Sequence, residues 1–432
     1  MKKNQIRILA VHAALVVFFS CLYSYRAVNT AYAAQQSGQT GIQNTTSAET
    51  EKDAADGGKS ADGETGLRTE APQISGLKYD HSMELDYADQ FRVDYYEGGY
   101  KYFSIAGTGE FLLVPEGARA PENLPEDAQV VYQPADSIYL AATSAMDFFD
   151  ALDAVEDVKL SCLEEGDWFI ASTNEAMKDG SMVYAGKYSA PDYERIVAEH
   201  CSLAVESTMI LYQPKVREML LKFGIPVIVE HSSYETEPLG RSEWIKFYGA
   251  LLNREDEADR LFTRMKEKAE GVLASEIQTS AAGTQDEEEG GEPLTAFFSI
   301  SQNGAVTVRK SADYIPKMIA MAGGKYVFDD LGGKDALSTM NIQMEEFYAA
   351  AKDCDVLIYN STIQGAVNSI GELEDKSSLM ADFKAVKEGN VWCTSQSLFQ
   401  KPTALADLLV DFHKVLKGDT DSGLTYLYRV GK

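Results

Sequence analysis

Catalytic motifs are absent from this sequence. It contains no HExxH pair, no GxSxG nucleophile elbow and no GxxxxGK[ST] phosphate loop, and its five histidines are scattered along the chain. These absences argue against a zinc protease, a serine hydrolase with that elbow and a P-loop nucleotidase. We therefore expect a protein that is not an enzyme and that needs no cofactor of its own, with a secreted hydrolase as a minor alternative.

Positive charge is scarce. Lysine and arginine number 39 against 67 aspartates and glutamates, the formal net charge is -28, and no run of basic residues interrupts this balance. An acidic surface repels the phosphates of nucleic acids and of anionic lipids. We therefore expect no nucleic acid and no anionic lipid surface among the partners.

Cysteine is also rare, with five residues and no CxxC or Cys/His ligand spacing. Besides Cys21, the chain has Cys162, Cys201, Cys354 and Cys393, of which the last three lie in or beside apolar runs. That setting is typical of small buried hydrophobic residues. Disulfides form outside the cytoplasm, and the sequence leaves their presence here open.

The apolar run near the N-terminus is short. ILAVHAALVVFF has twelve residues, fewer than the roughly 20 that span a bilayer, and it follows the basic segment MKKNQIR. Cleavage at AYAA would make residues 1–33 a signal peptide. Alternatively, FFSC is a lipoprotein signal that ends before Cys21, which would then carry the lipid. Both alternatives predict an exported protein, at the extracellular face of the cytoplasmic membrane or in the periplasm.

Two lobes are predicted in the rest of the chain. Residues 34–76 contain almost no large apolar side chains and predict a disordered spacer. Residues 77–240 predict a first lobe, with an extra β meander over 77–133 and then strands that alternate with helices. A second strand–helix series predicts a second lobe over 295–432. Such alternation favours parallel sheets with helices on both faces.

A long helix is predicted between the lobes, over residues 241–277. This segment contains no proline, and apolar residues such as Ile245, Tyr248 and Leu252 recur at helical spacing. Residues 278–294 follow as an acidic, glycine-rich loop. The predicted fold class is therefore α/β, with two Rossmann-like lobes joined by one long helix.

This layout resembles the helix-hinged substrate-binding proteins that serve ABC importers for iron-siderophores, haem and cobalamin. The resemblance covers residues 77–418 and rests on YSAPDYERIVAEHCSLAVES, FGIPVIVEHSSYETEPLGRSEWIKFYGALLNREDEA, ADYIPKMIAMAGGKYVFDD, and DVLIYNSTI with FKAVKEGNVWC. It implies central parallel sheets, a ligand cleft between the lobes and a monomer. It also implies a metal chelate (siderophore, haem or cobalamin) as ligand and ABC permease subunits as partners. A ligand sensor or haem-relay surface protein with the same fold is the alternative.

The resemblance also assigns a docking role to surface glutamates. In that family each lobe presents a glutamate at the start of a helix to arginines of the permease. The matching positions here are Glu194 and Glu346, with Glu345 as a close second. A carboxylate in the first turn is favoured by the helix dipole, by about 0.3–1 kcal/mol, and for that reason it also occurs in helices that dock nothing.

Ligands of open α/β sheets bind beyond the carboxyl ends of the strands. Strand ends and nearby loops therefore supply the candidate ligand-binding residues, which are Thr143, Ser144, Trp168, Tyr188, Ser207, Thr208, His231, Arg309, Asn360, Ser361 and Gln396. Aromatic and cationic side chains suit a large planar or anionic chelate. Serine and threonine at strand ends are equally common as helix caps.

His231 is the candidate ligand to a metal carried inside the chelate, because neutral imidazole is a common nitrogen donor. A lone histidine at a strand end more often has a structural hydrogen bond, and we expect no metal site of the protein's own. The segment YETEPLGR after it predicts a turn into the long helix, with Glu235 or Glu237 paired with Arg241.

Overall fold

The computed structural model describes residues 66–281, 291–333, 338–420 and 423–431, and all of them belong to one compact unit of the chain. The predicted export signal, with both of its cleavage alternatives, lies outside the described residues, as does most of the predicted spacer. None of the described helices is both long enough and apolar enough to cross a membrane.

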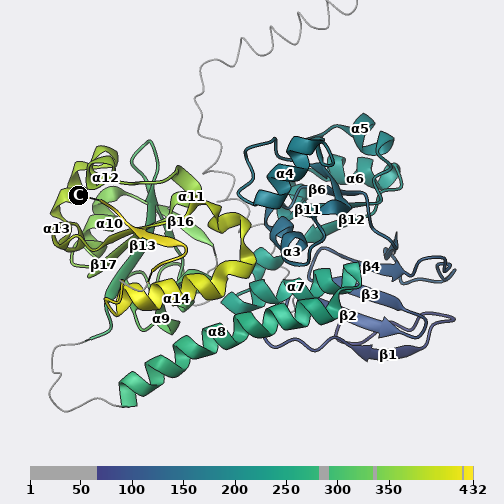
Figure 1. The fold of residues 1–432 in the computed structure, drawn as a ribbon, viewed down its shortest axis with the longest axis horizontal. Helices are drawn as coiled ribbons and strands as arrows, with labels where there is room; N and C mark the ends of the chain where they lie inside the picture. Colours follow the sequence, from purple (N-terminus) through teal and green to yellow (C-terminus); the bar gives the residue numbers. More distant parts are fainter. Residues whose placement is uncertain (1–65, 282–290, 334–337, 421–422, 432) are drawn as a thin grey trace, which may run out of the picture. The chain divides into compact units, whose positions relative to one another are not determined.

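The first sheet is formed by the predicted meander (Figure 1). Its strands are β1 (Tyr79–Ser82), β2 (Phe91–Tyr96), β3 (Tyr100–Ile105), β4 (Gly109–Val114) and β5 (Gln129–Tyr132). They lie in sequence order, antiparallel from β1 to β4, and β5 returns parallel to β4. Gly98 and Gly99 form the turn between β2 and β3 at φ 86° and 84°, where a side chain would be strained.

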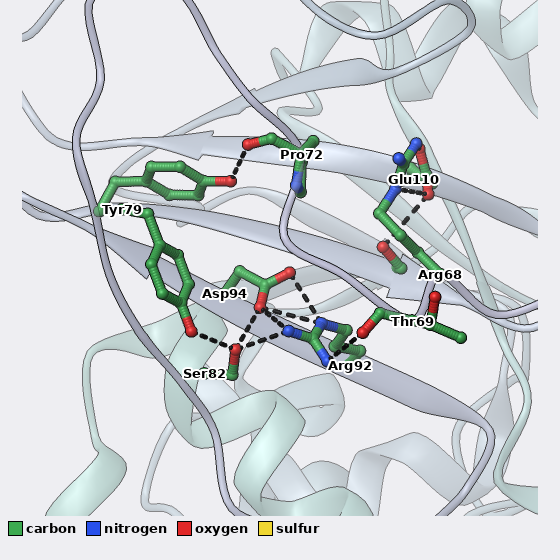
Figure 2. A network of polar contacts seen from close by, with 10 residues as sticks. Arg68, Thr69, Pro72, Tyr79, Ser82, Arg92, Asp94 and Glu110 are labelled. Atoms are coloured by element: carbon green, nitrogen blue, oxygen red, sulfur yellow. Dashed lines mark hydrogen bonds and ion pairs between the residues drawn. The ribbon is translucent and has the colours of Figure 1, made fainter.

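The segment just before this sheet is bound to it, although the sequence assigns this segment to the spacer. Arg68 makes a bidentate ion pair with Glu110 on β4, and both nitrogen–oxygen distances are 2.8 Å (Figure 2). Arg92 on β2 donates to the carbonyl oxygen of Thr69 at 3.2 Å. Residues 66–76 therefore belong to the fold, and the sequence assigned them to the spacer because they contain few large apolar side chains.

The first lobe contains a five-stranded parallel sheet in the order β12-β11-β6-β7-β8. Its strands are β6 (Ile138–Leu140), β7 (Val158–Ser161), β8 (Val183–Tyr184), β11 (Leu203–Ser207) and β12 (Val227–Glu230). Its helices are α3 (Met146–Ala151), α4 (Ala171–Asp179), α5 (Tyr193–Ala198) and α6 (Pro214–Lys222), and a small hairpin is formed by β9 (Gly186–Lys187) and β10 (Ala190–Pro191). Val205 and Ala204 face different core clusters, so both faces of the sheet are covered, as predicted.

The second lobe has a mixed sheet with a parallel centre. The parallel strands are β13 (Leu294–Ile300), β15 (Lys325–Tyr326), β17 (Val356–Tyr359) and β18 (Val391–Thr394). The antiparallel strands are β14 (Val306–Arg309), β16 (Thr339–Ile342) and β19 (Leu427–Arg429). The helices are α9 (Tyr314–Met321), α10 (Met344–Ala351), α11 (Ser361–Gln364), α12 (Ile370–Lys376), α13 (Lys384–Glu388) and α14 (Leu405–Leu416). The predicted parallel sheet is therefore its centre, with antiparallel strands added at the edges.

Two helices connect the lobes where the sequence predicts one over 241–277. They are α7 (Pro238–Leu252) and α8 (Glu255–Ala281), and the chain turns between them at Asn253, whose φ is 57°. Asparagine tolerates this left-handed conformation better than most residues. The two helices then pack along each other (Figure 1). The packing is close, because a Cβ atom at Gly249 would lie 2.5 Å from the Cβ of Ala258.

Helix α7 is the central element of the fold. Its Trp244 and Phe247 pack on the first sheet, where ring centroids of Phe91, Phe103 and Phe111 lie 4.9–6.1 Å from theirs. The same helix contacts α3 of the first lobe and α9 and α14 of the second. Through these contacts the helix joins both lobes and the first sheet into one core. Burial of each large apolar side chain contributes about 1.5–3 kcal/mol to the stability of the fold.

Two buried carboxylates, one on α7 and one in the turn before it, bind the segment between β1 and β2. Glu243 accepts hydrogen bonds from the backbone N–H groups of residues 86–88 at 2.7–2.8 Å. Glu235 accepts those of Asp89 and Gln90 at 3.0 and 3.1 Å. We refer to Glu235 and Glu243 as the carboxylate lock. It explains why these acidic side chains are tolerated inside the protein, since each has several hydrogen-bond donors.

Candidate ligand and docking sites

Parallel strands place the candidates of the first lobe at one edge of its sheet. Thr143 and Ser144 follow β6 in a short 3-10 helix, η1 (Thr143–Ala145), and both are half-buried. Ser207 ends β11, and Thr208 begins the next 3-10 helix. His231 follows β12 directly. Because β6, β11 and β12 are parallel neighbours, their carboxyl ends meet at the same edge.

Three candidates of the second lobe lie at the equivalent edge, whereas Arg309 ends β14, which runs antiparallel to β13. Asn360 and Ser361 follow β17, and Gln396 follows the adjacent parallel strand β18. Asn360 caps helix α11, since its Oδ1 accepts from the Thr362 N–H at 3.2 Å and from its hydroxyl at 2.7 Å. Ser361 donates to the Thr394 carbonyl oxygen at 2.6 Å. Of these three, only Gln396 is exposed.

The two edges face each other. The 3-10 helix η6 (Gln396–Gln400), which follows β18, contacts η1 of the first lobe. Gln400 bridges the lobes, because its Oε1 accepts from the Phe169 N–H at 2.8 Å and its Nε2 donates to the Asp167 carbonyl oxygen at 3.1 Å. The rings of Phe169 and Phe399 meet edge to face at 5.9 Å. Strand-end residues of both lobes are therefore brought together.

A second polar bridge joins the lobes through α3. Asp147 on this helix accepts from the Thr403 backbone N–H at 2.9 Å and from its hydroxyl at 2.6 Å. Burial raises the pKa of Asp147 to about 6, against the opposing effect of these two hydrogen bonds. Ser242 on α7 adds a hydrogen bond to the Pro402 carbonyl oxygen at 2.7 Å.

Trp168 and Tyr188 are less accessible than the sequence suggests. Trp168 is 2% exposed, and its indole N–H donates to the Ser161 hydroxyl at 3.0 Å. Tyr188 is half-buried against a core cluster of the first lobe. The sequence did not single out the neighbour Phe169, which is 44% exposed. The alternation of burial at 168 and 169 depends on the surrounding fold, and no local pattern distinguishes the two aromatics.

His231 is held as a neutral imidazole. Its ring stacks on Tyr234 with a centroid separation of 4.1 Å, and burial lowers its pKa to about 4. In the described part of the chain, its Nδ1 has no hydrogen-bond partner. Neutral imidazole is the form that binds metals, so the side chain keeps the chemistry proposed for it. The described residues contain no group of three or more His, Cys, Asp and Glu side chains placed to hold a metal ion.

Arg309 and Arg241 lie on the same aromatic ring. The guanidinium carbon of Arg309 is 5.7 Å from the centroid of the Tyr314 ring, and that of Arg241 is 4.3 Å from it. The predicted pairing of Arg241 with Glu235 or Glu237 is wrong. Glu235 belongs to the carboxylate lock, and Glu237 pairs with Lys317 of the second lobe at 2.7 Å.

The candidate docking glutamates occupy the positions expected of them in their helices. Glu194 lies in the first turn of α5, and Glu345 and Glu346 lie in the first turn of α10. All three are exposed. Each is therefore accessible to a cationic partner and is favourably placed at the positive end of a helix dipole.

The four cysteines in the described residues are free thiols. Cys162, Cys354 and Cys393 are buried, and Cys201 is half-buried. Burial raises the pKa of all four thiols, to about 11 at Cys201 and about 12 at Cys162 and Cys354. They therefore behave as the small apolar residues that the sequence predicts.

No family model matches the chain. Two similar proteins are both uncharacterized lipoproteins of the archaeon Methanocaldococcus jannaschii. The first is 24% identical over 368 residues, which is 80% of this chain and 83% of the relative. The second is 26% identical over 361 residues, which is 80% of this chain and 86% of the relative.

Solved structures match about two thirds of the chain. A periplasmic heme binding protein from Pseudomonas aeruginosa has a TM-score of 0.52 and 12% identity, and the match covers 69% of this chain and 98% of that one. A periplasmic binding protein from Veillonella parvula has a TM-score of 0.50 and 12% identity, and the match covers 66% and 91%. Identities this low establish the fold alone. The two-lobe α/β fold of periplasmic binding proteins, expected from the sequence, is confirmed.

Proposed function

We propose that this protein is the extracytoplasmic solute-binding component of an ABC importer. It captures a metal chelate, foremost a ferric siderophore, and delivers it to the permease. One observation carries this proposal. The carboxyl ends of strands in the two lobes face each other, on a fold shared with periplasmic binding proteins. That arrangement is where α/β proteins bind ligands. One structural neighbour is a heme binding protein, which supports a chelated metal as the ligand class.

Ligand capture is tested by titration with a panel of chelates. The protein is titrated with ferric catecholate and hydroxamate siderophores, haem and cobalamin, and tryptophan fluorescence and visible absorbance are followed. Saturable binding of one molecule per chain to one class is expected. If haem binds, replacing His231 with alanine is expected to change the absorbance of the bound haem. Failure of every chelate to bind would overturn the proposal of a chelate carrier.

We assign docking on the permease to Glu194 of the first lobe and to Glu346 of the second lobe. Glu345, the neighbour of Glu346, is the other candidate in the second lobe. Their exposure on first turns of helices in different lobes supports two contacts with arginines of a two-subunit permease. The double variant Glu194→Arg with Glu346→Arg is expected to abolish uptake and to leave the affinity for the ligand unchanged. The matched control reverses two other exposed carboxylates, Glu218 and Glu388, and should leave uptake intact.

The same experiment separates the importer from a ligand sensor or haem-relay protein. Neither alternative needs Glu194 and Glu346, so unchanged uptake in the double variant would contradict the docking role.

A membrane anchor through Cys21 fits an importer component and is supported by the two archaeal relatives, which are lipoproteins. Metabolic labelling with a fatty acid, lost in Cys21→Ala, would show the anchor, whereas cleavage at AYAA would release an unlabelled protein.

A further inference from the structure

Two arginines meet at the boundary between the lobes. Arg241 lies in α7, directly after the first lobe, and Arg309 ends β14 of the second lobe. Both guanidinium groups lie against Tyr314, at the start of α9, with carbon-to-centroid distances of 4.3 and 5.7 Å. Cation–π contacts favour such a geometry and fix both groups relative to one ring. Two positive charges are thereby held near each other in a protein whose net charge is -28.

The Arg241 charge lacks a close carboxylate. Among the described residues, no carboxylate lies within 4.0 Å of its guanidinium, which donates to the Ser233 carbonyl oxygen at 3.5 Å. The nearby carboxyl group of Glu230 is buried, and burial raises its pKa, against the opposing effects of hydrogen bonds from Ser232 and of the Arg241 charge. Arg309 pairs with Asp313 at 3.5 Å, and that carboxylate also caps α9 through the Ile315 N–H at 3.1 Å.

An unpartnered polar group lies in the turn that Arg241 contacts. His231 is 8% exposed, and its Nδ1 has no hydrogen-bond partner among the described residues. Buried polar atoms are almost always hydrogen-bonded in native proteins. The combination of this imidazole with Arg241 indicates a place where polar atoms of a ligand complete the hydrogen bonding.

We propose that Arg241 and Arg309 form an anion-binding pair that selects a chelate with a net negative charge, such as a ferric triscatecholate, over a neutral ferric trishydroxamate. This inference rests on the proposed function and adds the charge class of the ligand. A chain this acidic repels an anion at long range, so its affinity has to come from local cations. Guanidinium groups suit the task, because their planar donors form paired hydrogen bonds to catecholate and carboxylate oxygens.

The test compares two ferric chelates of similar size, a trianionic triscatecholate and a neutral trishydroxamate, by fluorescence titration. The wild-type protein is expected to bind the trianionic chelate more tightly. Arg241→Gln and Arg309→Gln should each weaken that binding by about tenfold or more, the usual effect of losing a hydrogen bond to a charged group, and leave binding of the neutral chelate within about twofold. Raising the salt concentration should weaken trianion binding less in the variants than in the wild type.

Controls separate recognition from folding. Arg264→Gln removes a positive charge on α8, where the residue pairs with Glu257 at 3.8 Å, and should change neither affinity. Arg241→Lys keeps the charge and should retain part of the preference. Equal weakening of both chelates in the glutamine variants would show a structural role and overturn the anion pair. A wild-type preference for the neutral chelate would overturn the pair and leave the carrier function standing, whereas wild-type failure to bind either chelate would overturn both.

Discussion

Glu206 is a carboxylic acid buried in the middle of a sheet. It lies on β11 with 0% exposure, and neither carboxyl oxygen has a hydrogen-bond partner among the described residues. Burial raises its pKa from 4.5 to about 8. In the folded protein the group therefore keeps its proton at pH values where the unfolded chain has lost it, and stability falls as the pH rises through this window.

Replacing Glu206 with glutamine tests this assignment. The wild-type free energy of unfolding is expected to fall between about pH 4.5 and pH 8, by up to about 1.4 kcal/mol per pH unit from this group. Glu206→Gln should lose that component and be more stable than the wild type at pH 8, by as much as about 4 kcal/mol. Urea unfolding at both ends of the window measures it. The exposed Glu199→Gln serves as control, and an identical pH slope in wild type and Glu206→Gln would contradict the assignment.

For single residues, the sequence predicted the place in the fold better than the residue that each side chain contacts. Ser207 and Asn360 were expected at strand ends and lie there, because short apolar runs followed by polar residues mark a strand end locally. The partner of Arg241 was expected within a few residues along the chain, yet its ring contact is Tyr314 of the other lobe. Likewise Trp168 is buried by its fold environment. Contacts between distant segments decide such cases, and one sequence does not reveal them.

At the scale of the elements, the C-terminal end of helix α7 is bound by a side chain of the first sheet. Lys101 on β3 is buried and donates to the Ala250 carbonyl oxygen and to the Asn253 side chain, both at 2.7 Å. It also pairs with Glu255, at the start of α8. The last carbonyl groups of a helix lack partners within the helix, and this lysine supplies one at the point where the chain turns.

Lys101→Met is therefore expected to destabilise the protein. The variant keeps much of the side-chain volume but leaves the Ala250 carbonyl and Glu255 without their buried donor, so the free energy of unfolding should fall by about 2–4 kcal/mol. Chemical denaturation measures the change. Lys78→Met, at an exposed position just before β1 of the same sheet where the lysine pairs with Glu97, should leave stability unchanged. Equal effects of the two substitutions would rule out the special role of Lys101.

The turn at Asn253 also explains why one predicted helix is two. The segment 241–277 has helical periodicity throughout, and one asparagine hardly disturbs that pattern. The turn is stabilised by tertiary contacts, namely the close packing of Gly249 on Ala258 and the hydrogen bond from the buried Lys101 of β3. Propensity and periodicity therefore located the helices correctly and could not show that they fold back on each other.

For the whole molecule, the connection between the lobes restricts their movement. Helix α7 packs against both lobes, and the bridges of Asp147 to Thr403 and of Gln400 to Asp167 and Phe169 cross the boundary. Opening the lobes widely would expose apolar surface and break these hydrogen bonds. A small rotation of the lobes leaves the packing of α7 in place.

Ligand binding is therefore expected to change the overall dimensions little. Small-angle X-ray scattering of the protein, free and saturated with its chelate, should show a change in radius of gyration below about 1 Å, as for partners that bind with little backbone movement. The same measurement on Gln400→Ala would show whether the bridge limits opening, because the free variant should then be the more extended of the two. A large compaction of the wild type on binding would contradict the rigid connection.

The carboxylate lock has a consequence for synthesis. Glu243 binds backbone groups 155–157 residues earlier in the chain, and the aromatic face of the first sheet packs on Trp244 and Phe247. Contacts between such distant segments form late. While the chain is being made or exported, the β2–β4 hairpins emerge early and wait with Phe91, Phe103 and Phe111 uncovered until α7 follows. We therefore expect a chaperone to bind strands β2–β4 during synthesis or export.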